Sequence, residues 1–157
     1  MSGPNTSPVV DFHRWRGGRD FMLQPFVGSI SKIGEWSLVF FGGEYSHAVL
    51  KRPPKDGWLV QDEYGGSVVS LDPPSEVKNT AIHASKKIFE SSEKWFGKTQ
   101  HPAYARYDLI LYQDQWCVGE VEMIEPELFF LERHSSGNII NEKACELFIR
   151  AIESLQK

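Results

Sequence analysis

Four charged side chains stand at alternate positions in two neighbouring β-rich runs of the sequence, 104–112 and 116–123: Arg106, Asp108, Glu120 and Glu122. Residues 113–115 join the runs, and a loop of three residues is common in β-hairpins. With a loop of that length, Asp108 lies opposite Glu120 and Arg106 lies opposite Glu122. All four side chains are then expected on one face of a sheet.

Such a cluster combines like charges that repel with a donor set that a metal ion prefers. Side chains directly opposite in antiparallel strands have Cβ atoms about 5 Å apart. Carboxylate oxygens suit Mg²⁺, which often binds together with substrate phosphates, so Asp108, Glu120 and Glu122 are candidate metal ligands. Arg106 is a candidate catalytic cation for a phosphate or a developing oxyanion. A solvated acidic face with a surface pair worth at most about 1 kcal/mol is the alternative, and spacing alone favours neither.

The remaining sequence predicts a sheet and two helices around this hairpin. Further strands are expected at 21–27, 35–41, 44–51 and 58–62. Apolar residues at helical spacing predict one helix from Ser75 towards Gly97 and a second across 141–155. The expected fold class is therefore α+β, an antiparallel sheet flanked by helices.

The glycine pair Gly42-Gly43 predicts a two-residue turn between the runs 35–41 and 44–51. With Phe41 opposite Glu44, strict alternation places these side chains on one face: Trp36, Leu38, Phe40, Tyr45, His47, Val49 and Lys51. Because that face is largely aromatic and aliphatic, His47 is expected to be a structural histidine rather than a ligand.

Composition and charge restrict the class of protein. A chain of 157 residues with 41% hydrophobic and 24% charged residues is typical of a single globular domain. A net charge of −4 argues against a nucleic-acid partner, which requires clustered cations. Two cysteines give neither a disulfide framework nor a thiolate metal site, and no run has the length of a signal peptide or membrane span. We therefore expect a cytoplasmic protein with no membrane partner.

The order of the motifs resembles that of ATP-grasp enzymes. Arg106-Tyr107-Asp108 followed by Glu120-Val121-Glu122 is similar to their metal-binding signature, with Glu122 in place of the usual asparagine. The resemblance continues through residues 24–26, 34–41, 46–52, 60–66 and 122–126, and covers most of 21–132. It is to the branch that includes prokaryotic glutathione synthetase-like and cyclo-ligase-like proteins.

The resemblance implies an ATP-dependent carboxylate–amine ligase that works through an acylphosphate. Asp108, Glu120 and Glu122 would hold one or two Mg²⁺ ions against the phosphates of ATP, and Arg106 would stabilise the acylphosphate. Two further sets of residues are implied as cofactor-binding: Gln24 and Phe26 in the hinge beside adenine, and Lys51 and Arg52 near phosphate. The other partner would be a carboxylate substrate, whose identity the sequence does not indicate.

The resemblance also implies that 21–157 is the C-terminal part of an ATP-grasp domain, preceded by a flexible leader at 1–20. Relatives carry a substrate-binding domain and an ATP-covering subdomain upstream, so an upstream domain, a complementary chain or a homo-oligomer is expected to be needed, and the isolated chain is expected to be inactive. A separate complementary chain predicts an exposed apolar rim near Phe26 and Phe40. Leu59 stands where relatives usually have arginine. A degenerate, non-catalytic interaction or structural domain is therefore the alternative function.

Overall fold

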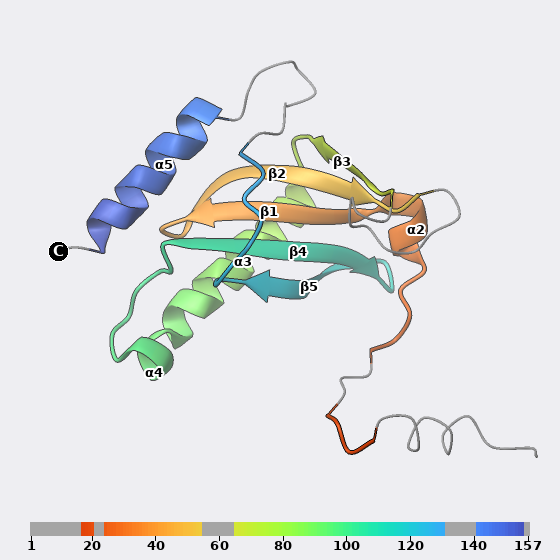
Figure 1. The fold of residues 1–157 in the computed structure, drawn as a ribbon, viewed down its shortest axis with the longest axis horizontal. Coiled ribbons are helices and arrows are strands. Elements are labelled where there is room, and N and C mark those ends of the chain that lie inside the picture. Colours follow the sequence, from red (N-terminus) through yellow and green to blue (C-terminus); the bar gives the residue numbers. More distant parts are fainter. Residues whose placement is uncertain (1–16, 21–23, 55–64, 131–140, 156–157) are drawn as a thin grey trace, which may run out of the picture.

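The computed structural model describes residues 17–20, 24–54, 65–130 and 141–155, and its centre is an antiparallel five-stranded sheet (Figure 1). The strands are β1 (Glu35–Phe41), β2 (Glu44–Arg52), β3 (Ser67–Ser70), β4 (Tyr104–Tyr112) and β5 (Gln115–Glu122), in the spatial order β3-β2-β1-β4-β5. The helices are α2 (Ser29–Ile33), α3 (Ser75–Ser91), α4 (Glu93–Phe96) and α5 (Asn141–Ser154). The predicted α+β class with a helix-flanked antiparallel sheet is confirmed.

Three predicted elements differ from the structure or lie beyond it. The strand expected at 21–27 is wrong for 24–27, which belong to no strand and lead into α2. The helix expected to reach Gly97 is interrupted at Ser92, whose Oγ donates to the carbonyl of Phe89 and accepts from the backbone N–H of Gln100, both at 2.8 Å. The strand expected at 58–62, with Leu59, lies outside the described residues, as does most of the predicted leader.

One face of the sheet packs against α3, which lies behind the sheet in Figure 1. Val77 and Ala81 are one turn apart on α3 and are both fully buried against the sheet. The core of this layer consists of Trp36, Leu38, Phe40, Ala48, Leu50, Val77, Ala81, Ala105, Tyr107 and Leu109. Each large side chain buried here contributes about 1.5–3 kcal/mol, which makes this face the main support of the sheet.

The β1–β2 hairpin contains an irregularity that strict alternation does not predict. The Gly42-Gly43 turn and the Phe41–Glu44 pair are as predicted, and Phe40 pairs with Tyr45. Val39 then pairs with His47, so Ser46 is an extra residue, a β-bulge. The predicted face is therefore wrong beyond the bulge: His47, Val49 and Lys51 lie on the face opposite α3. Tyr45 stays beside Phe40, with ring centroids 5.7 Å apart.

The face opposite α3 is covered at one end by α5 and by residues 123–130, which we call the crossing segment. In Figure 1 this segment leaves β5 and passes in front of β4, β1 and β2. The second core forms here from Val39, Phe41, Val49, Phe129, Ala144, Leu147 and Ala151. His47 is buried in this layer, and its Nε2 donates to the carbonyl of Leu128 at 2.8 Å. His47 is thus a structural histidine that holds the crossing segment on the sheet.

We expect the stability of the protein to fall as the pH drops from 7 to 5, because burial lowers the pKa of His47 below its ordinary value of 6.5. The neutral imidazole is favoured in the folded state, so its contribution is complete above pH 6.5 and is lost as the pH falls through the folded-state pKa. The loss is at most about 1.4 kcal/mol per pH unit for one proton. Denaturant unfolding at a series of pH values measures it.

The matched variant is His47→Gln, which keeps an N–H donor near the position of Nε2 but does not titrate. We expect a flatter dependence on pH rather than none, because burial also lowers the pKa of His101. An unchanged slope in His47→Gln would show that protonation of His47 does not contribute to acid unfolding.

Within the described ranges, no helix has the length and apolar character needed to cross a membrane.

Candidate functional site

The β4–β5 hairpin pairs the charged residues as predicted, but through a different turn. Its turn has two residues, Gln113 and Asp114, both with positive φ (50° and 61°), as in the twisted turns that suit hairpins. Leu109 pairs with Val118 and Asp108 with Glu120, so Gly119 is an extra residue. The predicted Asp108–Glu120 pair and the pair of Arg106 with Glu122 are therefore confirmed.

The shorter turn and the bulge together have a packing consequence. The three-residue loop predicted for this hairpin would place Trp116 on the charged face and Cys117 on the helix-packed face. Instead, Trp116 packs against the core beside α3, and Cys117 lies on the charged face together with Ile110. The shorter turn thus brings the indole ring of Trp116 into the core, and the bulge keeps Glu120 opposite Asp108.

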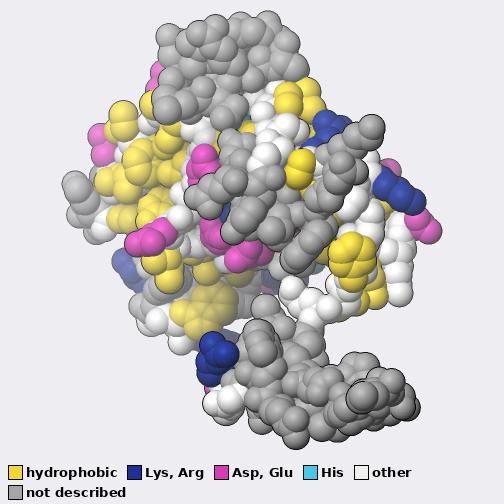
Figure 2. Space-filling model, turned by 45° about the vertical axis from the view of Figure 1, so that its right-hand side comes forward, with side chains coloured by type: hydrophobic (Ala, Val, Ile, Leu, Met, Phe, Trp, Pro, Cys, Tyr) yellow, Lys and Arg dark blue, Asp and Glu magenta, His cyan; other side chains and the backbone are white. Residues whose placement is uncertain are grey.

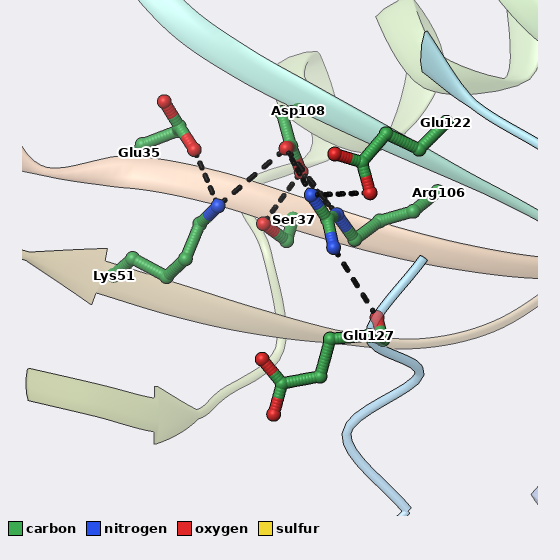
Figure 3. Close-up of polar contacts among 7 residues, drawn as sticks. All are labelled: Glu35, Ser37, Lys51, Arg106, Asp108, Glu122 and Glu127. Carbon is green, nitrogen blue, oxygen red and sulfur yellow. Dashed lines mark hydrogen bonds and ion pairs between the residues drawn. The ribbon is translucent and has the colours of Figure 1, made fainter. Parts of the chain in front are cut away.

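The charged side chains form one connected network on the face opposite α3 (Figure 3). Lys51 Nζ lies 2.5 Å from Glu35 Oε1 and 3.5 Å from Asp108 Oδ2. Arg106 Nη2 lies 2.9 Å from Asp108 Oδ2 and 2.9 Å from Glu122 Oε2. The β1–β2 bulge is what brings Lys51 to this face.

Asp108 is the centre of the network and is buried, with 3% of the residue exposed. Oδ1 accepts from Ser37 Oγ at 2.6 Å and from Arg106 Nε at 2.9 Å. Oδ2 accepts from Arg106 Nη2 at 2.9 Å and from Lys51 Nζ at 3.5 Å. Ser37 pairs with Asp108 in the register of β1 with β4, so the backbone of the sheet itself brings the hydroxyl to the carboxylate.

Burial and neighbouring charges have opposite effects on the pKa values of Arg106 and Glu35. Burial lowers the pKa of Arg106, but the hydrogen bonds and charge of Asp108 outweigh it and hold that pKa above its ordinary value. Burial raises the pKa of Glu35 above its ordinary value even though Lys51 opposes the shift. Arg106 therefore remains a cation, and the short contact with Lys51 does not fully compensate Glu35 for lost hydration.

The crossing segment bounds the network on one side. Arg106 Nη1 donates to the carbonyl of Glu127 at 3.5 Å, and the guanidinium lies 5.9 Å from the ring centroid of Phe129. Phe129 is buried and has a φ of 51°, which is unusual for a residue with a bulky side chain. Strained backbone of this kind is maintained where the surrounding packing fixes it, here between the second core and Arg106.

A pocket of about 590 Å³ adjoins the network on the same face. Its apolar lining includes Phe26, Val27, Ile30, Ile110 and Val118, and its polar lining includes Gln24, Glu35 and Glu120. Figure 2 shows acidic side chains gathered near the middle of one face of the molecule, with hydrophobic side chains beside them. Glu35 and Glu120 thus border both an apolar hollow and the charged network.

Most of the predicted site residues lie on this face. Arg106, Asp108, Glu122 and Lys51 are in the network, and Gln24, Phe26 and Glu120 line the pocket. Arg52 follows Lys51 on β2, so its side chain alternates to the other face, where it is exposed. Sequence reasoning missed two members, Glu35 and Ser37. Ser37 has a recognisable signal, since it is the polar residue within the apolar run Trp36 to Phe41.

Carboxylate oxygens are the donor type that a divalent cation prefers, but in the structure these carboxylates pair with Lys51 and Arg106. Among the residues that the structure describes, no group of three His, Cys, Asp or Glu side chains is arranged to hold a metal ion. Asp108 and Glu122 are instead turned towards Arg106. Together with Glu120, which lies opposite Asp108, the network has four carboxylates and two cations, so its formal charge of −2 would be neutralised by one Mg²⁺.

No family model and no curated protein matches the sequence. Solved structures of ligases of the ATP-grasp class are similar to the chain. One of them is D-cycloserine synthetase DcsG, with 26% identity over 85% of this chain and a TM-score of 0.61. D-alanine–D-alanine ligase from Bacillus anthracis matches over 77% of this chain with 16% identity and a TM-score of 0.49, and its complex with ATP with 15% identity and a TM-score of 0.46.

The likeness to D-cycloserine synthetase supports the resemblance to the ATP-grasp superfamily. This chain spans 42% of the length of that synthetase.

Proposed function

We propose that residues 21–157 form the C-terminal part of an ATP-grasp domain, which binds ATP with Mg²⁺ and takes part in ATP-dependent ligation of a carboxylate to an amine or similar nucleophile. In this reaction a substrate carboxylate oxygen attacks the γ-phosphorus of ATP and ADP leaves. The nucleophile then attacks the acyl carbon and phosphate leaves.

The observation that carries the proposal is the continuity of the apolar pocket with the acidic network. A nucleotide has an apolar base at one end and a polyanion at the other, so its site needs a hollow for the base beside charges for the phosphates. Here the pocket contains Phe26 and Ile110, and Glu120 lies at its border opposite Asp108. In our proposal the base occupies the pocket beside Gln24 and Phe26, and the phosphates extend towards Asp108.

The remaining residues have roles that follow from their charge. Asp108, Glu120 and Glu122 would hold Mg²⁺, which when bound neutralises phosphate charge and orients the γ-phosphate. Arg106 is kept cationic by Asp108 and would stabilise negative charge on the acylphosphate and the tetrahedral intermediate. Lys51, already beside Asp108, would contact phosphate. Arg52 was implied for the same role, and its place on the opposite face supports Lys51 instead.

A further protein unit would complete this site. Three residues around the pocket have exposed apolar side chains: Phe26 (76%), Tyr112 (36%) and Val118 (37%). Phe40 was expected in the same rim and that prediction is wrong, since Phe40 is 1% exposed in the core beside α3. The exposed rim supports an upstream domain, a complementary chain or a second copy of this chain as the cover of the pocket.

The variant Glu120→Gln tests the function. Without ligand we expect unfolding free energy equal to that of the wild type or slightly higher, because a like charge opposite Asp108 is removed. With Mg²⁺ and a non-hydrolysable ATP analogue at about 100 times Kd, the wild type should gain about 2.7 kcal/mol. Glu120→Gln should need at least about tenfold more Mg²⁺ for the same gain, since a hard dication loses an anionic ligand. Thermal unfolding with and without each addition measures both effects.

Glu146→Gln is the matched control, because Glu146 is an exposed carboxylate on α5 away from the network. It should respond to Mg²⁺ and the analogue as the wild type does. A wild-type protein indifferent to both additions would rule out the nucleotide site and leave the alternative, a non-catalytic interaction or structural domain.

A further inference from the structure

Ser37 is a buried hydroxyl in a strand that is otherwise apolar at its centre. Its side chain is fully buried, and its neighbours on β1 are Trp36 and Leu38. A buried hydroxyl is costly unless it is hydrogen-bonded. The Oγ of Ser37 donates to Oδ1 of Asp108 at 2.6 Å. The hydrogen bond to Asp108, and not packing alone, therefore accounts for a serine at this buried position.

The other partners of Asp108 are shared with competing carboxylates. Lys51 Nζ lies closer to Glu35 (2.5 Å) than to Asp108 (3.5 Å). Arg106 divides its Nη2 between Asp108 and Glu122 at 2.9 Å each, while its Nε donates to the two oxygens of Asp108 at 2.9 and 3.2 Å. Both are long, flexible side chains, and a bound polyanion or dication would compete for these ion pairs. Ser37 is short and neutral, and its interaction with Asp108 does not depend on net charge.

The backbone also favours Ser37 as the fixed partner. β1 is the middle strand of the five, with β2 on one side and β4 on the other. Ser37 and Asp108 are register partners on these adjacent strands, so a short side chain is enough to reach the carboxylate. Functional groups held on central strands keep their geometry better than groups held on loops.

We propose that Ser37 is a positioning residue, which fixes the orientation of the Asp108 carboxylate towards a divalent cation bound with the nucleotide phosphates. This inference rests on the proposed function. Ser37 does not touch the cation or the nucleotide in our proposal. It restrains one oxygen of Asp108 while Arg106 and Lys51 turn from that carboxylate to the phosphates. Partners that orient a metal ligand in this way typically change metal affinity by about 10–100-fold when removed.

The test compares Ser37→Ala with Ser70→Ala in the 157-residue chain. Ser70 is an equally buried serine, but its Oγ donates to the backbone carbonyl of Ala48 at 3.3 Å, away from the network. Each protein is titrated with Mg²⁺ at a saturating concentration of a non-hydrolysable ATP analogue, and the Tm is recorded. We expect the Mg²⁺ midpoint of Ser37→Ala to rise about tenfold and that of Ser70→Ala to stay within twofold of wild type.

The conservative variant Ser37→Thr keeps the hydroxyl, and its midpoint should return to within about threefold of wild type if the hydrogen bond is responsible. If Ser37→Ala does not fold, the Mg²⁺ midpoint of Ser37→Cys is measured instead, because cysteine has a side chain of similar shape with only a weak donor.

The outcomes separate this inference from the function on which it rests. A wild type with a clear Mg²⁺ midpoint and a Ser37→Ala variant with the same midpoint would overturn the positioning role and leave the nucleotide site in place. A wild type without any response to Mg²⁺ and the analogue would overturn both. Equal shifts of the Mg²⁺ midpoint in Ser37→Ala and Ser70→Ala would show that Ser37 only stabilises the fold, and would overturn its positioning role.

Discussion

Replacing Arg106 by methionine is expected to lower the free energy of unfolding by about 3–5 kcal/mol, the usual cost of removing one partner from a buried ion pair. Arg106 is 8% exposed, and it supplies three of the hydrogen bonds to Asp108, which is 3% exposed. Methionine fills a similar volume without charge, so Asp108 and Glu122 remain facing each other with no guanidinium between them. Urea unfolding followed by circular dichroism measures the loss.

Lys87→Met is the matched control, because it also removes a cation from an ion pair. Lys87 Nζ lies 2.7 Å from Glu90 Oε2, but the two side chains are 61% and 58% exposed, so solvent screens the pair and we expect no measurable loss of stability. Adding Asp108→Asn to Arg106→Met should recover part of the stability, since the uncompensated charge is then removed. A loss in Arg106→Met no larger than in Lys87→Met would mean that the network does not contribute to the stability of the fold.

The second large effect is expected for Gly34→Ala, which should cost at least about 3 kcal/mol. Gly34 joins α2 to β1 with φ 96° and ψ −173°, a region that is essentially restricted to glycine. A Cβ there would lie 2.5 Å from the backbone carbonyl oxygen of Lys51. The backbone of β2 would have to move away, and the Glu35–Lys51 contact with it. Thermal unfolding should therefore show a large fall in Tm.

Gly97→Ala separates the steric contribution from the conformational one. Gly97 ends α4 with φ 69°, and nothing in the described structure lies within 4 Å of a Cβ at that position. The cost there is limited to the left-handed conformation, about 1–2 kcal/mol. Equal losses for Gly34→Ala and Gly97→Ala would contradict the predicted clash with β2.

The sequence was sufficient to predict the two hairpins of the sheet and the pairing of the charged residues in the second one, because of the geometry of strands. The side-chain period of a strand is two, so Arg106, Asp108, Glu120 and Glu122 share a face in any register that keeps their parity. The turn was nevertheless predicted with one residue too many. The extra residue at Gly119 compensates for that difference, because it restores the same parity beyond the bulge.

The position of Lys51 was not predictable in the same way. Alternation from the Gly42-Gly43 turn places Lys51 with Trp36 and Leu38, and nothing in the local sequence signals that Ser46 is unpaired. The bulge follows from tertiary packing, which keeps Tyr45 beside Phe40 and brings His47 to the crossing segment. Glu35 and Ser37 were missed for a related reason, since their partners come from other strands.

The bulges at Ser46 and Gly119 also determine how these hairpins can change length during evolution. Loss of the codon for either residue removes an unpaired position, so every partner on the adjacent strand is kept. Loss of the codon for Val121 instead pairs the carboxylate of Glu122 with Tyr107, on the apolar side beside α3. Single-residue gaps in alignments of related genes should therefore gather at the two bulges and be absent from the codons for residues 120–122.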